Sequence, residues 1–314
     1  MRCALDRKRL PLRRFLLACL LAPAVALADA GARSCAADPV AVQILGSGGP
    51  WLNGERASTA YLLWVGDRAK VLVDMGGGAF LRFGQSQARL GDLSLVALSH
   101  FHPDHVSDLP ALLWLSSLTR QEPLPIAGPS GNAFAPSLPE FLRRMFDGKD
   151  GAFQVLGGTL GGPPNAAGGG GVRLDPRVAD AEKLDPTTVY ESDGLTVTAL
   201  GVPHANIPTL AYRVTTHGVS VVFGADQNGG NPRFVDFARG ANVLILHLAV
   251  AAGVSTPLHA PPATVGRLAQ SAGVRRLIVS HFGQFDLDAA VAELRKSYTG
   301  PLTVGADLQC TQVR

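Results

Sequence analysis

The stretch Ser99-His100-Phe101-His102-Pro103-Asp104-His105 decides both the fold and the kind of site that this chain is expected to have. It holds three of the eight histidines of the chain within six residues. The apolar run Leu95–Ser99 leads into it with the pattern of a buried β-strand, and Val106–Leu118 continues from it with helical spacing. A single histidine in such a place would be interpreted as a packed core residue, whereas this cluster predicts metal binding.

The spacing within the cluster suits two neighbouring metal ions. Alternate side chains of an extended segment point the same way, so His100 and His102 can reach one metal. Asp104 and His105 are displaced toward a second metal. Imidazole and carboxylate groups are typical zinc ligands, although iron and manganese also accept them, and two adjacent metals can share one hydroxide nucleophile.

Three more candidate ligands follow apolar strand patterns further along the chain. His204 ends Gly-Val-Pro-His, Asp226 ends Val-Val-Phe-Gly-Ala-Asp, and His281 follows Leu-Ile-Val-Ser. A site at the strand ends is built from residues at such strand-to-loop junctions. We expect Asp226 to bridge the two metals with one oxygen on each. Buried structural roles for the two histidines, and a turn-forming role for the aspartate, are the alternatives.

Short β-rich runs alternate with helical patterns, which predicts an α/β fold: a four-layer αβ/βα sandwich with its site at the strand ends. The predicted strands are Val42–Leu45, Ala60–Val65, Val71–Asp74, Leu95–Ser99, Leu195–Leu200, Ala211–Thr215, Val219–Phe223, Val243–His247 and Leu277–Ser280. The predicted helices are Ala79–Ala88, Val106–Leu118, Pro232–Ala238, Pro262–Ala272 and Asp286–Ser297. We interpret residues 116–190, which are rich in proline and glycine, as a lid or insertion within a single domain, 31–314.

The first thirty residues have the composition of a secretory signal peptide. Basic residues from Arg7 to Arg14 precede the apolar run Phe15–Leu27, and small residues follow it. The run is too short to favour a retained membrane anchor. We therefore expect a periplasmic or secreted protein, and the pair Arg13-Arg14 also permits twin-arginine export of a protein folded around its metal.

Removal of this leader changes the charge and the cysteine count. A cut after Ala28 removes six Lys/Arg and one Asp, which leaves 22 positive and 24 negative residues and changes the formal charge from +3 to −2. We therefore do not interpret the basic composition as a sign of nucleic-acid binding. Two cysteines remain, Cys35 and Cys310, and a disulfide between them is a hypothesis that suits an oxidising compartment, with two free thiols as the alternative.

The order of these motifs resembles the metallo-β-lactamase superfamily. Asp74 in Leu-Val-Asp-Met-Gly-Gly-Gly is similar to its first motif, in which a strand-end aspartate supports the site by hydrogen bonding. The resemblance implies one metal held by three histidines, a second held by an aspartate and two histidines, and a bridging aspartate. The implied ligands are His100, His102 and His204 for the first metal, Asp104, His105 and His281 for the second, and Asp226 between them.

Within the superfamily, the chain resembles the branch of ribonuclease Z and the zinc-dependent arylsulfatase-like proteins, through Leu-Gly-Ser-Gly-Gly-Pro at 45–50, Arg56-Ala-Ser-Thr and Pro203-His204. His259 in Pro-Leu-His-Ala is similar to a histidine of that branch that lies near the leaving group, which implies a general acid or oxyanion donor. With Asp104, it completes the residues to which we assign catalytic roles. One departure is His247-Leu248, where relatives often have His-Glu, so His247 is interpreted as either a site residue or a packed core residue.

The resemblance implies a hydrolase with two metals, zinc by preference, in which a metal-bound hydroxide attacks a small phosphoester or sulfate ester. Lactone or β-lactam hydrolysis is the main alternative, and a ribonuclease Z-like nuclease or an iron-dependent thiol oxidoreductase are others. A non-catalytic binding protein is disfavoured because all seven ligand positions are filled.

The expected partner is a small-molecule ester, and no nucleic acid is expected. The predicted export signal, the charge of −2 and the absence of a long basic arm between His204 and Asp226 argue against a ribonuclease. The sequence leaves the oligomeric state open, with a dimer as one option.

Overall fold

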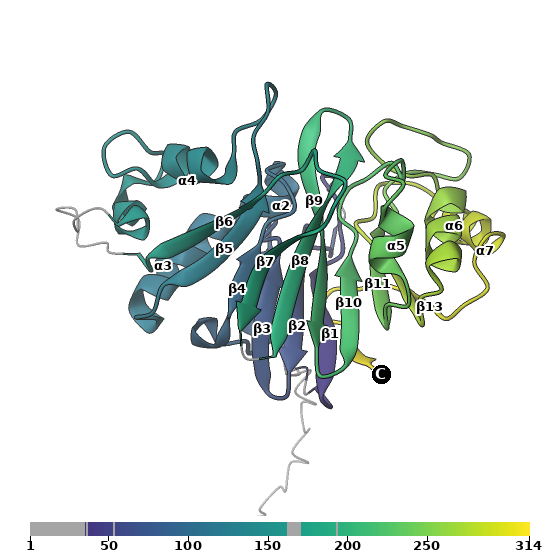
Figure 1. Cartoon of the computed structure of the whole chain (residues 1–314), viewed down its shortest axis with the longest axis horizontal. Helices are drawn as coiled ribbons and strands as arrows, with labels where there is room; N and C mark the ends of the chain where they lie inside the picture. Colours follow the sequence, from purple (N-terminus) through teal and green to yellow (C-terminus); the bar gives the residue numbers. More distant parts are fainter. Residues whose placement is uncertain (1–34, 36, 53, 162–170, 193) are drawn as a thin grey trace, which may run out of the picture. The chain divides into compact units, whose positions relative to one another are not determined.

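Two seven-stranded mixed β-sheets form the inner layers of the fold. Figure 1 shows the arrangement of the elements in the computed structural model. The structure describes residues 35, 37–52, 54–161, 171–192 and 194–314. The first sheet has the strand order β14-β1-β2-β3-β4-β5-β6. Its strands are β1 Val40–Gly46, β2 Ala60–Val65, β3 Arg68–Val73, β4 Leu95–Ala97, β5 Leu124–Pro129, β6 Leu174–Ala179 and β14 Cys310–Val313.

The second sheet has the strand order β13-β12-β11-β10-β9-β8-β7. Its strands are β7 Thr187–Ser192, β8 Leu195–His204, β9 Ile207–Thr216, β10 Val219–Phe223, β11 Val243–His247, β12 Leu277–Ser280 and β13 Leu302–Val304. Strands β7 to β10 are antiparallel neighbours, and β10 to β13 are parallel neighbours. In the first sheet, β3 to β6 are likewise parallel.

Helices pack on the outer face of each sheet. On the first sheet lie α1 Ala79–Gln85, α2 Pro103–Val106, α3 Leu109–Thr119 and α4 Leu138–Phe146, with the 3₁₀ turns η1 Leu90–Asp92 and η2 Gln154–Leu160. On the second lie α5 Phe234–Ala238, α6 Pro262–Ala272 and α7 Leu287–Arg295, which Figure 1 shows together beside β10 and β11. The predicted αβ/βα sandwich is thus confirmed.

Three hydrophobic cores separate the four layers, and this explains the continuous apolar runs of the central strands. Successive side chains of a strand point to opposite faces, so Leu62 lies in the core under the first helices and Leu63 in the core between the sheets. In β11, Leu244 lies under α5–α7 and Ile245 lies between the sheets. Each buried leucine or isoleucine of this kind stabilises the fold by roughly 1.5–3 kcal/mol relative to an exposed one.

The segment 116–190, predicted as a lid or insertion, takes a larger part in the sandwich. Its described residues include β5 and β6, which extend the first sheet, and β7, which forms an edge of the second. Strand β6 alternates poorly because Asp175, Pro176 and Arg177 are only partly buried or exposed, as an edge position allows. A lid role for the rest of the segment stays a prediction, and residues 162–170 of its glycine tract lie outside the described residues.

The two ends of the described chain are joined covalently. Cys35 and Cys310 form a disulfide with their Cα atoms 5.6 Å apart, as the sequence predicted, which ties the segment before β1 to β14. The predicted signal peptide, 1–30, lies outside the described residues and stays a prediction. Among the helices that the structure describes, none combines the length and the apolar character needed to cross a membrane.

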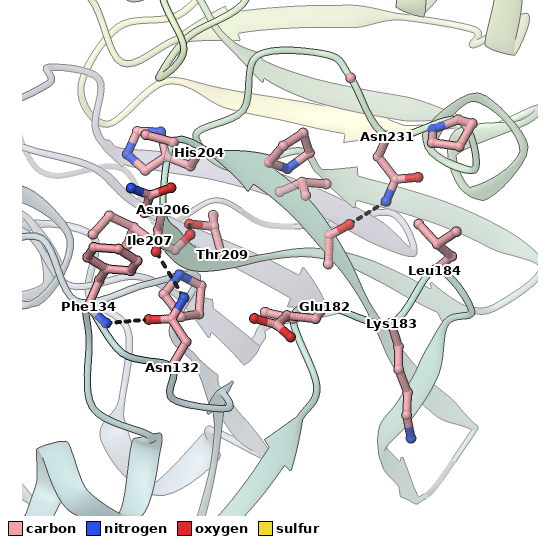
Figure 2. Close-up of a pocket in the computed structure, with 18 residues that line it drawn as sticks. Asn132, Phe134, Glu182, Lys183, Leu184, His204, Asn206, Ile207, Thr209 and Asn231 are labelled. Atoms are coloured by element: carbon pink, nitrogen blue, oxygen red, sulfur yellow. Dashed lines mark hydrogen bonds between the residues drawn. The ribbon is translucent and has the colours of Figure 1, made fainter.

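A pocket of about 430 Å³ opens where β8 turns into β9, and His204 at the end of β8 is part of its wall (Figure 2). Its lining consists of the facing ends of the two strands and residues of the segments 132–134, 181–184 and 230–232. The pocket therefore borders the edge of the second sheet at which the candidate ligands are expected.

Candidate metal centre

The seven predicted ligands gather at one edge of the two sheets. The run His100–His105 follows β4, and His204 ends β8. Asp226 follows β10, and His281 follows β12. Strand β9 is antiparallel to both β8 and β10, so β8 and β10 end at the same edge, and the parallel β12 ends there too. The topology thus brings together residues that are up to 181 positions apart in sequence.

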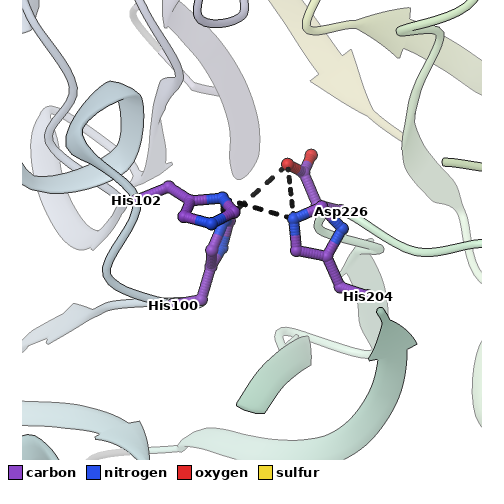
Figure 3. A group of neighbouring side chains, drawn as sticks. All are labelled: His100, His102, His204 and Asp226. Carbon is purple, nitrogen blue, oxygen red and sulfur yellow. Dashed lines mark hydrogen bonds and ion pairs between the residues drawn. The ribbon is translucent and has the colours of Figure 1, made fainter. Parts of the chain in front are cut away.

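The first group consists of His100, His102, His204 and Asp226, which Figure 3 shows converging on one point. His102 Nδ1 lies 3.0 Å from His100 Nε2 and 3.3 Å from His204 Nε2. Asp226 Oδ2 lies 3.5 Å from His204 Nε2 and 3.8 Å from His100 Nε2. Three imidazole nitrogens and one carboxylate oxygen around one point form a four-donor set that suits a divalent cation.

The second group consists of Asp104, His105 and His281, all of which are buried. His281 Nε2 lies 3.1 Å from Asp104 Oδ2 and 3.3 Å from His105 Nε2. Asp226 faces this group as well, with Oδ2 3.5 Å from His105 Nε2 and Oδ1 3.3 Å from His281 Nε2. The Asp226 carboxylate therefore lies between the two groups, as the bridging role requires.

Further contacts fix the orientation of the histidine rings. The backbone N–H of Ser99 donates to Asp74 Oδ1 over 2.7 Å, and Asp74 Oδ2 lies 2.8 Å from His105 Nδ1. Ser99 Oγ lies 3.0 Å from His100 Nδ1, and His204 Nδ1 lies 2.7 Å from the Leu258 carbonyl. Each of these histidines thus uses Nδ1 for a protein contact and points Nε2 at the centre. Contacts of this kind fix the orientation of a histidine ring and raise its basicity as a metal ligand.

The local backbone is specialised for this crowding. A Cβ at Gly76 would lie 2.0 Å from the Asp104 carbonyl oxygen, so the Gly-Gly-Gly run after Asp74 must begin with glycine to let α2 approach. Asp74 and His281 both have left-handed backbone conformations, with φ of 59° and 60°. Strained conformations of this kind persist where the surrounding structure holds them, which is common at functional sites.

His247 lies in the centre, although the sequence left its role open. Its Nδ1 lies 2.5 Å from Asp226 Oδ1, its Nε2 lies 3.1 Å from the Tyr61 hydroxyl, and its ring stacks on that of His281 at 4.5 Å. Together with Asp226 and His281 it forms a third group of converging donors. The feature that could have placed His247 in the centre is its position at the end of β11, which lies next to β10 in the sheet.

The predicted donor His259 also faces the centre, just before α6. Its ring centroid lies 5.1 Å from that of His204 and 5.5 Å from that of His281, so it stands between one member of each group. Its Nδ1 lies 3.9 Å from Asp226 Oδ1 and is buried without a hydrogen-bond partner among the described residues. A buried imidazole nitrogen without a partner fits a residue that awaits a ligand or substrate.

Burial and charge set the protonation of these residues. Burial lowers the pKa of His100 and of His204, and burial with the nearby His281 lowers the pKa of His247 to about 4. Burial opposes ionisation of Asp226, but His281 and His105 outweigh it and hold the pKa of that carboxyl well below its usual range. Most of the cluster is therefore in the state that binds metals, neutral imidazole with ionised carboxylate.

These pKa values predict how the stability of the metal-free protein depends on pH. The pKa of His259 is lowered to about 3, chiefly by burial, and that of His247 to about 4, whereas an unfolded histidine titrates near 6.5. Below about pH 6.5 the unfolded chain then binds more protons than the folded chain, so stability falls with pH. His105, whose pKa is raised by Asp74 and Asp226 against the effect of burial, offsets only part of this.

We expect the free energy of unfolding in chelator to fall by about 2 kcal/mol or more between pH 7 and pH 5. Urea denaturation at the two pH values measures it. The His259→Gln variant, which has one buried histidine fewer, should lose less over the same interval. Equal or greater stability of the parent protein at pH 5 would contradict the assigned protonation states.

The contact between Tyr61 and His247 predicts a role in metal binding. Tyr61 is buried, and a hydroxyl proton donated to His247 Nε2 leaves the proton of that ring on Nδ1, facing Asp226. We expect Tyr61→Phe to weaken metal binding roughly tenfold, as loss of an outer contact commonly does. Competition with a fluorescent zinc chelator measures this affinity.

The matched control is Tyr212→Phe. Tyr212 is also fully buried, but its hydroxyl donates to the Leu98 carbonyl over 2.7 Å rather than to a histidine of the centre. It should cost stability with little change in metal affinity. An equal fall in affinity for both variants would show that Tyr61 acts only through general packing.

The donor set fits divalent cations. All donor atoms within each group lie within 4.8 Å of one another, so one ion can contact every member with small side-chain adjustments. Histidine nitrogens and carboxylate oxygens are ligands that zinc accepts and that iron and manganese share. The His281 Nδ1 atom, like that of His259, is buried without a partner in the part of the chain that the structure describes.

Comparison with known proteins gives a consistent family. Residues 70–282 match the model of the beta-lactamase superfamily domain. Among curated proteins, the chain is 30% identical over 193 residues to ribonuclease Z of Mycobacterium sp. (strain KMS), across 60% of this chain and 61% of that relative. It thus spans about three fifths of that relative's length. It is 26% identical over 295 residues to ribonuclease Z of Mycobacterium bovis (strain BCG / Pasteur 1173P2), across 87% of this chain and 98% of that relative.

Solved structures support the fold. The metallo-beta-lactamase fold protein YhfI from Bacillus subtilis is similar with a TM-score of 0.69 and 21% identity, over 87% of this chain and 99% of that one. Human tRNase Z, short form, is similar with a TM-score of 0.64 and 21% identity, over the same shares of the two chains. At this identity the likeness concerns the fold alone, and it confirms the expected metallo-β-lactamase sandwich.

These comparisons correct one expectation from the sequence. We expected no nucleic-acid partner, but the curated relatives are ribonucleases, which act on RNA. The expectation relied on a net charge of −2 and on the absence of a long basic arm. Net charge averages over the whole surface, whereas a phosphate bound at a metal centre is recognised by the local charge there.

Proposed function

The chain belongs to the beta-lactamase superfamily and is a metal-dependent hydrolase, and from this premise we propose that it hydrolyses phosphodiester bonds, with RNA as the substrate class. The observation that carries the proposal is the Asp226 carboxylate, which faces three histidines of one group and the second group as well. Two cations held on either side of this carboxylate would suit the two non-bridging oxygens of a phosphodiester. The similarity to ribonuclease Z over 98% of a relative's length supports the choice of RNA.

The residues of the centre would divide the work. His100, His102 and His204 would hold one cation, Asp104, His105 and His281 the other, and Asp226 would contact both. When bound, two divalent cations would supply neutralisation of phosphoryl charge and activation of a water nucleophile. We propose zinc as the metal because histidine nitrogens dominate the donor set.

We propose that His259 assists by donating a hydrogen bond. Its low pKa makes it neutral near pH 7, so it carries one N–H and acts as a donor rather than as a strong acid. Its ring lies beside members of both groups, where charge would develop on the phosphate or on the departing oxygen.

The test is metal content together with a substrate panel on purified protein. We expect about two metal ions per chain and cleavage of an unstructured RNA oligonucleotide and of bis-p-nitrophenyl phosphate, both abolished by chelator and restored by zinc. Faster turnover of p-nitrophenyl sulfate, a lactone or nitrocefin would overturn the phosphodiester proposal. One iron per chain with thiol oxidation would overturn the two-metal assignment.

We also propose that the protein is exported. The disulfide between Cys35 and Cys310 supports this, because such bonds persist in oxidising compartments. The experiment is N-terminal sequencing of the protein recovered from the producing cells. A start near residue 29 supports export, and an intact N-terminus in the cytoplasm argues against it.

A further inference from the structure

The pocket beside His204 has the chemistry of a binding site for the rest of the substrate. It is lined by His204 of the first group, so it adjoins the metal centre. Its volume of about 430 Å³ lies in the range of small-molecule sites. Figure 2 shows His204 at one end of the pocket, with Asn132, Glu182 and Asn231 of three other loops around it.

Phe134 offers an aromatic surface in this pocket. The residue is 67% exposed although it is large and apolar, and it lines the pocket. The loop that carries it is fixed, because Asn132 Oδ1 accepts hydrogen bonds from the backbone N–H groups of Phe134 and Ala135. Asn132 Nδ2 donates to the Asn206 carbonyl over 3.0 Å, which joins this loop to the turn after His204. A loop whose backbone is held in place loses less conformational entropy when its aromatic residue stacks on a ligand.

Two polar groups complete the pocket. Within the described residues, neither the Asn206 side-chain amide nor the Glu182 carboxylate has a hydrogen-bond partner, and both residues are exposed. In Figure 2 the Glu182 carboxylate faces Asn132 across the pocket, whereas Lys183 extends away from it. The pocket therefore presents an amide and a carboxylate acceptor, with no cation pointing inward that would favour a second phosphate.

We propose that this pocket binds the ribonucleoside attached to the phosphate at the metal centre. The base would stack on Phe134, its edge would pair with the Asn206 amide, which both donates and accepts, and the ribose hydroxyls would donate to Glu182. This inference rests on the proposed function and extends it, because it assigns the selection of ribonucleotides to named residues outside the metal ligands.

The experiment measures binding rather than turnover. Zinc-loaded protein is titrated calorimetrically with adenosine 3′- and 5′-monophosphate, their 2′-deoxy counterparts, and ribose 5-phosphate. We expect the tighter adenosine phosphate to bind roughly tenfold more tightly than ribose 5-phosphate, and Phe134→Ala to remove that difference. Glu182→Gln should remove the preference for the ribonucleotide over the deoxyribonucleotide.

Phe153→Ala is the matched control, because Phe153 is also a large exposed aromatic residue, at 41%, but does not line the pocket. It should bind all ligands as the parent does. Equal affinity of the parent for adenosine phosphate and ribose phosphate, or equal losses in Phe134→Ala and Phe153→Ala, would overturn the inference. If the protein cleaves diesters but shows no preference for the base, only this inference fails. If it prefers the base but cleaves no diester, only the proposed function fails.

Discussion

Replacing Asp226 with asparagine is expected to lower hydrolysis by roughly 10³-fold or more and to reduce the metal content to one ion per chain or less. Asparagine keeps the shape of the side chain but removes the negative charge that lies 3.3 Å from His281 Nε2 and 3.5 Å from His105 Nε2. One change thereby weakens both donor groups. Metal analysis and the rate of diester hydrolysis measure the two effects independently.

Asp236→Asn is the control for this prediction. Asp236 lies on α5, is exposed, and pairs with Arg239 rather than with the centre. Its variant should retain about two metals and the full rate. If Asp226→Asn also retained both metals and most of the activity, Asp226 would not bridge, and His247 would be the next residue to test because it belongs to the remaining donor group.

Removal of the disulfide is expected to produce the largest change in stability. The bond joins residues 275 positions apart, so it restricts nearly the whole described chain in the unfolded state. We expect the double variant Cys35→Ser with Cys310→Ser to lose about 2–5 kcal/mol in free energy of unfolding. Urea denaturation of the oxidised protein and of the variant measures the difference.

Reduction of the parent protein provides the control. With dithiothreitol its denaturation midpoint should shift to that of the double variant, while the variant should not respond to the reductant. Metal content should remain the same in both, because neither cysteine belongs to the donor groups. Identical midpoints for the oxidised parent and the double variant would contradict the stabilising role of the bond.

The central strands could be predicted from the sequence because they are buried on both faces. Strands β2, β10, β11 and β12 and helix α6 have the predicted bounds, since their apolar runs begin and end with the elements. Strands β5 and β6 could not be found in this way. Strand β5 lies inside the first sheet, but Pro125 and Pro129 interrupt its apolar pattern. Strand β6 is at the edge, where exposed polar residues conceal the pattern because an edge strand is covered on fewer sides.

One helix was also predicted too simply. The expected helix Val106–Leu118 is divided in the structure into α2, which ends at Val106, and α3, which begins at Leu109. Asp108 between them has a structural task, because its carboxylate accepts a hydrogen bond from the Phe80 backbone N–H over 2.9 Å. Pro110 suits the first turn of α3, where no backbone donor is required.

The predicted metal ligands could be found from the sequence because each of them lies in a local pattern. Each predicted ligand ends or follows a strand, and the structure brings all seven together. His247 was left open because its contact with Asp226 depends on the parallel pairing of β10 and β11, which a single sequence does not specify. The pocket lined by Phe134 was not predicted either. It is formed by loops that are about fifty positions apart or more, and a single sequence does not specify which distant loops lie together.

The most direct test of the central claim is a crystal structure of the zinc-loaded protein with anomalous scattering recorded at the zinc edge. We expect two anomalous peaks, one among His100, His102, His204 and Asp226 and one among Asp104, His105, His281 and Asp226, with the Asp226 carboxylate between them. A single peak, or a second peak held by His247 in place of Asp104 and His105, would contradict this assignment of the ligands.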